Sequence, residues 1–155
     1  MPLFVGEFEQ TIDAKHRLAI PAPLRDGLED EEYGGSFYLV LGTDGYLWLY
    51  PDRYYRRLVA TIRRSPLPAK SAAGIEMLFA MARVIKPDPQ GRVVLPEKSM
   101  QRSRITDSVT LVGSGDHIVI WPAQDWERRV DEALPTYGQM LTEAADRLNA
   151  EAAER

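Results

Sequence analysis

Two short stretches of the chain combine an aspartate, turn-forming residues and an arginine in the same order. The first spans residues 13–17 with Lys15 at its centre, and the second spans residues 88–92 with Gln90 at its centre. Each stretch continues into three apolar residues and a proline. An arginine guanidinium suits phosphate oxygens and, through its planar fork, the edge of a guanine. Both stretches are therefore candidate nucleic-acid contacts.

The second stretch has the residues that a type I turn prefers. Asp88 stands at the first position, Pro89 at the second and Gly91 at the fourth. The aspartate carboxylate can accept from backbone N–H groups further along, and a glycine in the left-handed region lets a strand resume. In the first stretch His16 replaces the glycine, and histidine tolerates positive φ. We expect Asp13, His16, Asp88 and Gly91 to shape the two turns.

The arginine of each turn has two possible roles. Arg17 can pair with Asp13 and brace the turn, or it can contact DNA, or it can do both. For Arg92 the choice between pairing with Asp88 and contacting DNA stays open.

The basic residues are distributed unequally between the turns. Lys15 and Arg17, with Arg25 after the following strand, form a small basic group that we expect near the first turn. The second turn offers Gln90 and Arg92, and a neutral glutamine releases no counterion. If the turns contact DNA, the first turn is therefore expected to carry most of that contact.

The elements around the turns occur twice. The expected order is strand, turn, strand, short helix, hairpin and helix, with strands at 4–12, 18–20, 36–41 and 46–50 and again at 81–86, 93–95, 108–112 and 117–121. The turns are 75 residues apart, and the pairs Tyr50-Pro51 and Trp121-Pro122 are 71 residues apart. Two copies favour a pseudo-twofold fold over a solenoid. We expect a mainly β (α+β) protein with repeats at 3–64 and 81–134, a connecting helical segment at 65–80 and a helical acidic tail at 135–155.

Composition excludes several classes of protein. Apolar residues make up 45% of the 155 residues, there is no cysteine, and no apolar run approaches the length of a membrane span. The N-terminus lacks a signal-peptide pattern. The net charge of −4 comes from the region after residue 124, where eight acidic residues face four basic ones. A neutral body can still present a basic patch, and we expect a cytoplasmic protein without a membrane partner.

The doubled Asp-x-x-x-Arg motif, Trp121-Pro122 with Trp126, and the opening Phe4-x-Gly6 resemble the MraZ family over roughly residues 3 to 140. The resemblance implies an AbrB-like swapped-hairpin β-barrel, here built from two repeats in one chain. It also implies a nucleoid-associated, sequence-specific transcriptional repressor that binds double-stranded DNA. Such proteins form ring-like homo-oligomers on repeated promoter elements upstream of the division and cell-wall gene cluster. The implied DNA contacts are Lys15, Arg17, Arg25, Gln90 and Arg92.

Other functions find less support in the residues. His16 and His117 are the only histidines, too few converging ligands for a metal site. Asp13 and Asp88 could act as an acid–base pair, but no nucleophile or phosphate-binding glycine loop accompanies them. We expect no catalytic residue, no cofactor and no small-molecule ligand. The alternative is an antitoxin-like interaction module whose tail, with apolar residues at helical spacing from Tyr137 to Leu148, binds a partner protein.

Overall fold

The computed structural model describes residues 1–28, 34–62 and 72–155. The chain forms two compact units, Met1–Ala123 and Gln124–Arg155. The predicted boundary between residues 64 and 65 lies outside the described residues. Among the helices in the described part of the chain, none has both the length and the apolarity that a membrane span requires.

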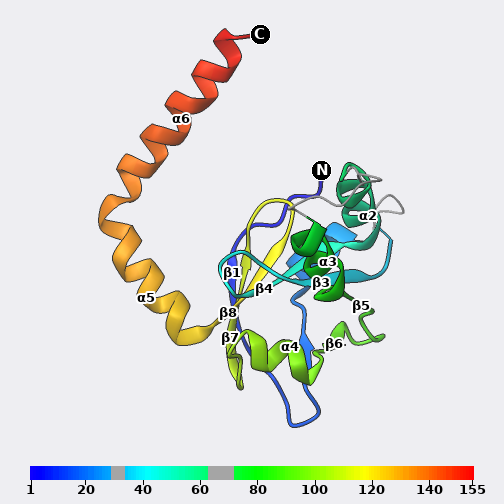
Figure 1. The fold of residues 1–155 in the computed structure, drawn as a ribbon. Helices are drawn as coiled ribbons and strands as arrows, with labels where there is room; N and C mark the ends of the chain where they lie inside the picture. Colours follow the sequence, from blue (N-terminus) through cyan, green and yellow to red (C-terminus); the bar gives the residue numbers. More distant parts are fainter. Residues whose placement is uncertain (29–33, 63–71) are drawn as a thin grey trace. The chain divides into compact units, whose positions relative to one another are not determined.

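Most strands of the first unit belong to one antiparallel sheet (Figure 1). The strand order across this sheet is β1-β7-β8-β4-β3-β5. The strands are β1 (Glu7–Thr11), β3 (Phe37–Leu41), β4 (Leu47–Pro51), β5 (Arg83–Ile85), β7 (Ser108–Gly113) and β8 (Ile118–Pro122). The predicted mainly β (α+β) class is therefore confirmed, and the sheet is antiparallel.

The two strands that follow the Asp-x-x-x-Arg turns pair with each other in a second, smaller sheet. These are β2 (Arg17–Ala19) and β6 (Arg92–Val94), and they run antiparallel. The helical segments are α1 (Ala22–Arg25), the 3₁₀ turn η1 (Asp26–Leu28), α2 (Asp52–Ala60), α3 (Ala72–Ala80), α4 (Glu97–Arg102), α5 (Ala123–Ala133), η2 (Leu134–Thr136) and α6 (Tyr137–Ala153). Of the connecting helical segment expected at 65–80, the part from Ala72 onward is observed as α3, and residues 65–71 lie outside the described part.

The order of the six strands shows how the two repeats combine. Read from either edge, the sheet presents equivalent strands, because β1 pairs with β7 as β5 pairs with β3. The registers agree, since Gln10 opposes Val109 as Ile85 opposes Phe37. Each repeat therefore gives its first strand to the hairpin of the other.

The sheet does not close into the barrel that the family resemblance implies. Among the described residues the ladder ends at β1 on one side and β5 on the other. β2 and β6 are bonded to each other as a separate pair rather than joining these edges. The architecture is an open sheet with a strand pair packed on it.

The core lies between the large sheet and the β2/β6 pair. Leu18 and Val93 oppose each other in that pair, and both are fully buried. They belong to the same apolar cluster as alternate residues of the central strands, namely Leu47, Leu49, Leu111, Ile118 and Ile120. Burying one such side chain stabilises a fold by about 1.5–3 kcal/mol. This packing fixes one face of the strand pair against the sheet and leaves the other face outward.

The first strand is shorter than the expected 4–12. β1 begins at Glu7, and Phe4 makes only an isolated bridge to Gly115. Gly6 between them has a φ of 95°, which a side chain rarely allows. At Gly113 a β-carbon would lie 2.4 Å from the backbone nitrogen of Val5, so glycine permits the close crossing there.

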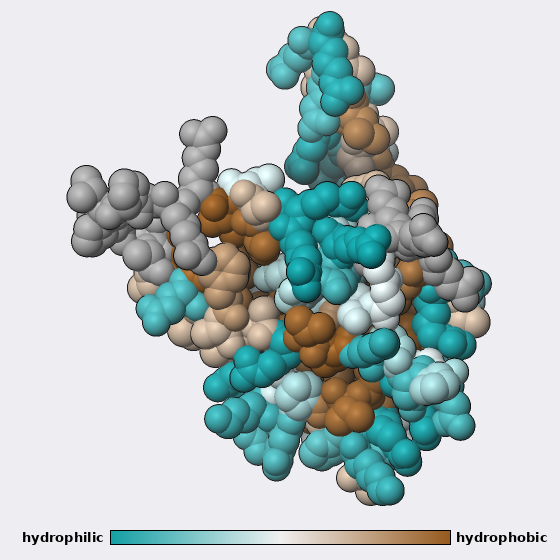
Figure 2. Space-filling model, turned by 90° about the vertical axis from the view of Figure 1, so that its right-hand side faces the viewer, coloured by the Kyte–Doolittle hydropathy of each residue, from teal (hydrophilic) through white to brown (hydrophobic). Residues whose placement is uncertain are grey.

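Apolar side chains also remain on the surface. Figure 2 shows apolar surface among polar residues on the face that lies to the right in Figure 1. In the second unit, Tyr137, Met140, Leu141 and Leu148 of α6 are exposed. The helical spacing predicted for this segment is confirmed, and its apolar stripe is uncovered in the single chain.

Candidate nucleic-acid interface

The first turn is organised around the Asp13 carboxylate. Its Oδ1 accepts from the backbone N–H of Lys15 at 2.9 Å and from that of Arg17 at 2.8 Å. Its Oδ2 accepts from Arg17 Nε at 2.6 Å. The backbone N–H of His16 donates to the Asp13 carbonyl at 3.0 Å, and His16 has a φ of 62°. One carboxylate therefore fixes both the backbone of the turn and the side chain of its arginine.

The second turn repeats these contacts with different residues. Asp88 Oδ1 accepts from the backbone N–H groups of Gln90 and Arg92, both at 2.9 Å. Its Oδ2 accepts from Arg92 Nε at 3.0 Å. The N–H of Gly91 donates to the Asp88 carbonyl at 2.9 Å, with a φ of 79°. The predicted turn-shaping contacts of Asp13, His16, Asp88 and Gly91 are present.

These contacts show which guanidinium atoms of Arg17 and Arg92 are used within the protein. Within the described residues, Arg17 and Arg92 use only Nε toward their aspartates, and their terminal Nη atoms make no hydrogen bond. Both side chains are 33% exposed. Bracing the turn and contacting a ligand are therefore compatible, because the pair with aspartate orients the fork without occupying it.

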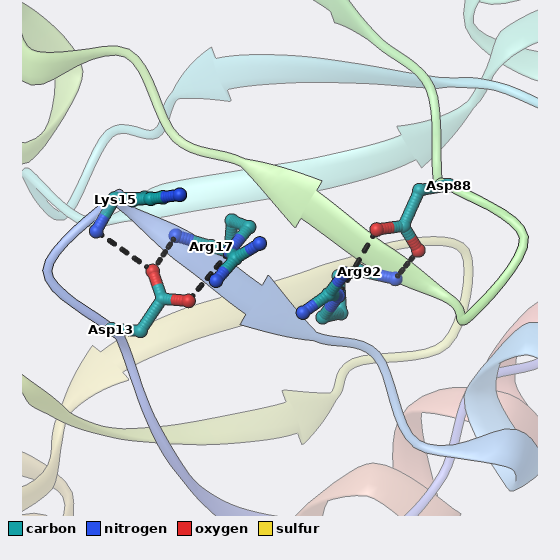
Figure 3. Close-up of polar contacts among 5 residues, drawn as sticks. All are labelled: Asp13, Lys15, Arg17, Asp88 and Arg92. Atoms are coloured by element: carbon teal, nitrogen blue, oxygen red, sulfur yellow. Dashed lines mark hydrogen bonds and ion pairs between the residues drawn. The ribbon is translucent and has the colours of Figure 1, made fainter.

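The two turns lie at opposite ends of the β2/β6 pair (Figure 3). The carbonyl of His16 accepts from the N–H of Leu95 at 2.8 Å, and that of Gly91 accepts from Ile20 at 2.9 Å. Each turn is therefore hydrogen-bonded to the chain that leaves the other strand. His16 and Gly91, which have positive φ, thus each add one hydrogen bond to the strand of the other repeat in the β2/β6 pair.

The outward face of the strand pair carries both arginines. Arg17 lies opposite Val94, and Ala19 lies opposite Arg92. Side chains alternate along a strand, so these four share one face while Leu18 and Val93 occupy the buried one. The result is a two-stranded ribbon with an arginine at each end, each opposite a small apolar residue of the other strand.

Arg25 lies at a different turn from the one that the sequence predicts. Its guanidinium covers Gly91, where a β-carbon would come within 2.6 Å of Arg25 Cζ. The reason is the antiparallel pairing, which brings the end of β2, and hence α1, beside the start of β6. The expected grouping of Lys15, Arg17 and Arg25 around the first turn is wrong. Reading the two motifs as paired strands of one ladder would have located Arg25 correctly.

Both aspartates are more acidic than usual. The backbone N–H of Arg17 is the main hydrogen-bond donor that holds the pKa of the Asp13 carboxyl below its usual value of 3.8, helped by the Arg17 side chain and the Lys15 N–H. The N–H of Arg92, with its side chain and the Gln90 N–H, lowers the pKa of Asp88 in the same way. Both groups are therefore charged near neutral pH, which keeps the arginines oriented.

The second histidine belongs to an aromatic cluster. The His117 ring stacks on Trp48 with 4.3 Å between centroids, and its Nδ1 lies 2.7 Å from Asp116 Oδ1. Asp116 also accepts from the hydroxyl of Tyr54 at 2.7 Å. Among the described residues, no three histidine or carboxylate side chains gather as metal ligands would. These contacts join the hairpin of one repeat to the strand and helix of the other.

The helix α2, which follows Tyr50, carries Arg53, Arg56 and Arg57. Its Arg56 pairs with Asp52 of the same helix at 2.7 Å and lies 5.9 Å from the ring of Tyr38. Residues 63 and 64 lie outside the described part of the chain. The observed contacts of Arg56 are those of an exposed helix surface.

Comparison with known proteins identifies the family. The family model described as "MraZ protein, putative antitoxin-like" matches the chain twice, at residues 3–77 and 78–148. The chain is 38% identical over 130 residues to a protein of Herpetosiphon aurantiacus named "Transcriptional regulator MraZ", covering 83% of this chain and 87% of that protein. A protein of Lactiplantibacillus plantarum with the same name is 33% identical over 93% of this chain and 99% of its own length. The chain belongs to the MraZ family.

Proposed function

We propose that this protein is a transcriptional regulator that binds double-stranded DNA through the outward face of the β2/β6 ribbon and its two turns. The names of its relatives support regulation of transcription. The observation that carries the proposal is the pair of arginines whose Nε atoms are held by aspartates while their Nη atoms are left for a ligand. Lys15, Arg17, Arg25, Gln90 and Arg92 are the proposed contacts.

The ribbon also has a shape that suits DNA. The major groove admits a two-stranded β-ribbon, in which arginine reads guanine or binds phosphate. The fixed Nε–carboxylate contacts reduce the conformational freedom that each arginine loses on binding. The proposed ribbon therefore enters the groove with its forks already oriented.

The proposal extends to assembly and to the target. One subunit has few cations on a neutral body, so strong binding requires several linked ribbons. We propose a ring-like homo-oligomer, larger than a dimer, on repeated promoter elements upstream of the division and cell-wall gene cluster, acting as a nucleoid-associated repressor. Light scattering at micromolar concentration tests assembly, and a monomer would contradict it.

An electrophoretic shift with the DNA upstream of the protein's own gene tests the central claim. Retardation at physiological salt is expected for the wild type, and the variant carrying both Arg17→Ala and Arg92→Ala should lose it. A wild-type protein that binds neither this DNA nor any competitor would refute DNA recognition.

An antitoxin-like interaction is the second candidate. It is favoured by the uncovered apolar stripe of α6 and by the description of the family model. Truncation after Leu134 distinguishes the two functions, because it should leave DNA binding by the ribbon in place. If truncation abolished a protein interaction while the full chain bound no DNA, the second candidate would be favoured.

A further inference from the structure

Arg25, like Lys15, is a basic residue of the interface that pairs with no carboxylate among the described residues, and its guanidinium is the one held against the protein surface. Within the described residues its guanidinium makes no hydrogen bond or ion pair, and its Nε is buried without a partner. Arg17 and Arg92, by contrast, are each paired with an aspartate. A guanidinium that is partly withdrawn from water and faces no anion is suited to receive one from a ligand.

The space that holds Arg25 exists because residue 91 has no side chain. A β-carbon there would lie 2.6 Å from Arg25 Cζ, 2.6 Å from Nη1 and 2.7 Å from Nε. Backbone lies directly beneath the guanidinium, so the side chain is positioned over the turn rather than extended into solvent. Glycine at this position thus serves the arginine as well as the positive φ.

The other half of the pseudo-twofold fold lacks this arrangement. Arg25 N–H donates to Pro21 O as Met100 N–H donates to Pro96 O, so Arg25 and Met100 occupy equivalent helix positions. Met100 is buried, and in the first turn His16 stands at the position equivalent to Gly91. Arg25 is thus combined with a turn that has glycine at its left-handed position, whereas Met100 is combined with a turn that has His16 there.

Charge shows what Arg25 adds to the second turn. Asp88 and Arg92 cancel and Gln90 is neutral, so that turn has no net charge of its own. In the first turn Lys15 adds one positive charge to the cancelled pair of Asp13 and Arg17. Arg25, placed on Gly91, restores to the second turn the charge that Gln90 does not supply.

We infer that Arg25 and the second turn form a phosphate-binding site shared by the two repeats, with Gly91 as its floor. The inference rests on the proposed DNA-binding function and assigns the ligand group, a backbone phosphate. Arg25 supplies the unbalanced charge and Arg92 the oriented fork, the former from the first repeat and the latter from the second. Both ends of the ribbon then attract phosphate, through Lys15 at one and Arg25 at the other.

The main test is the salt dependence of DNA affinity for Arg25→Met and Arg25→Lys. Methionine is the residue at the equivalent position 100, so it preserves an apolar contact with the turn while removing the charge. Arg25→Met should weaken binding to all sequences alike and lower the slope of log affinity against log salt by about 1 per contacting subunit. Arg25→Lys should restore the slope. Arg129→Met on α5, in the other compact unit, removes the same charge and should leave the slope unchanged.

A second pair of variants tests the role of glycine. Gly91→Asn introduces a β-carbon under the guanidinium with a residue that tolerates positive φ. Gly45→Asn makes the matched change in the turn between β3 and β4, where φ is 84° and a β-carbon would meet no atom within 4 Å. Gly91→Asn should reproduce the loss of Arg25→Met and add little to it in the double variant, whereas Gly45→Asn should keep the wild-type slope. If Gly91→Asn does not fold, as judged by thermal melting, the Arg25 variants decide.

The outcomes separate this inference from the proposed function. If the wild type binds DNA and Arg25→Met has an unchanged slope, the shared phosphate site is refuted while DNA recognition stands. If the wild type binds no DNA, the proposed function fails, and retention on heparin, a sulfated polyanion without bases, decides the inference. Elution of Arg25→Met at lower salt than the wild type and Arg129→Met would support the site, and equal elution would overturn it.

Discussion

The two turns have the same hydrogen-bond geometry but reach a positive charge by different routes. In both, one carboxylate oxygen binds two backbone N–H groups and the other binds an arginine Nε. The first turn adds Lys15 from its own sequence, whereas Arg25 of the other repeat covers the second. Each end of the ribbon is therefore built by residues of both repeats, and the charge of the second end does not come from one repeat alone.

The largest expected effect is the loss of either turn arginine. Arg17→Ala and Arg92→Ala should each weaken DNA binding by about 1–3 kcal/mol, because each removes an oriented fork. The equal geometry predicts losses of similar size, in contrast to the dominance of the first turn expected from the sequence. Titrations of folded, assembled variants against one DNA fragment measure both. A loss for Arg17→Ala more than tenfold that for Arg92→Ala would restore the unequal arrangement.

A control is needed because removing an arginine frees its aspartate. Arg17→Ala leaves the Asp13 carboxylate without its side-chain partner, where it would repel phosphate. The double variant with Asp13→Asn removes that charge and keeps a turn-forming side chain. Recovery of affinity in the double variant measures the repulsion, and the remaining loss measures the contact made by Arg17.

Much of the fold could be predicted from the sequence because its signals are local. The Asp-Pro-x-Gly turn and the hairpin expected between the strands at 36–41 and 46–50 each depend on residues adjacent in the chain, and the observed elements follow them. The spacing of 75 residues also predicted pseudo-symmetry, which the strand order shows.

What could not be predicted depends on pairing between distant residues. Nothing local in Arg25 indicates that β2 pairs with β6, and this pairing alone brings the arginine to Gly91. That the six-stranded sheet stays open and does not close into a barrel likewise depends on which strands pair at its edges. The candidate residues were therefore identified from the sequence, while the grouping of one of them required the structure.

A smaller effect is expected from exchanging the residues at the tips of the turns. Lys15→Gln makes the first tip like the second, and Gln90→Lys makes the second like the first. Because each change alters one exposed positive charge, the salt slope should fall by about 1 in the first case and rise by about 1 in the second. The double exchange should return the slope to the wild-type value if the ends are equivalent. If the salt slope changed with Lys15→Gln but not with Gln90→Lys, the two ends of the ribbon would contact DNA differently.

The smallest expected effect concerns stability at acid pH. The pKa values of Asp13 and Asp88 are both lowered, mainly by backbone N–H donors, so their ionised forms are favoured in the folded state. A lowered pKa contributes stability above the unfolded value near 3.8, and that contribution is lost as the pH falls through the lower folded value. Asp13→Asn and Asp88→Asn should therefore melt below the wild type at pH 6, and the difference should shrink below about pH 4. Since the two carboxylates make equivalent contacts, the difference in melting temperature should disappear over the same pH range for both variants. A difference in melting temperature that persisted at pH 2.5 for only one variant would show that this aspartate supports its turn through shape rather than charge.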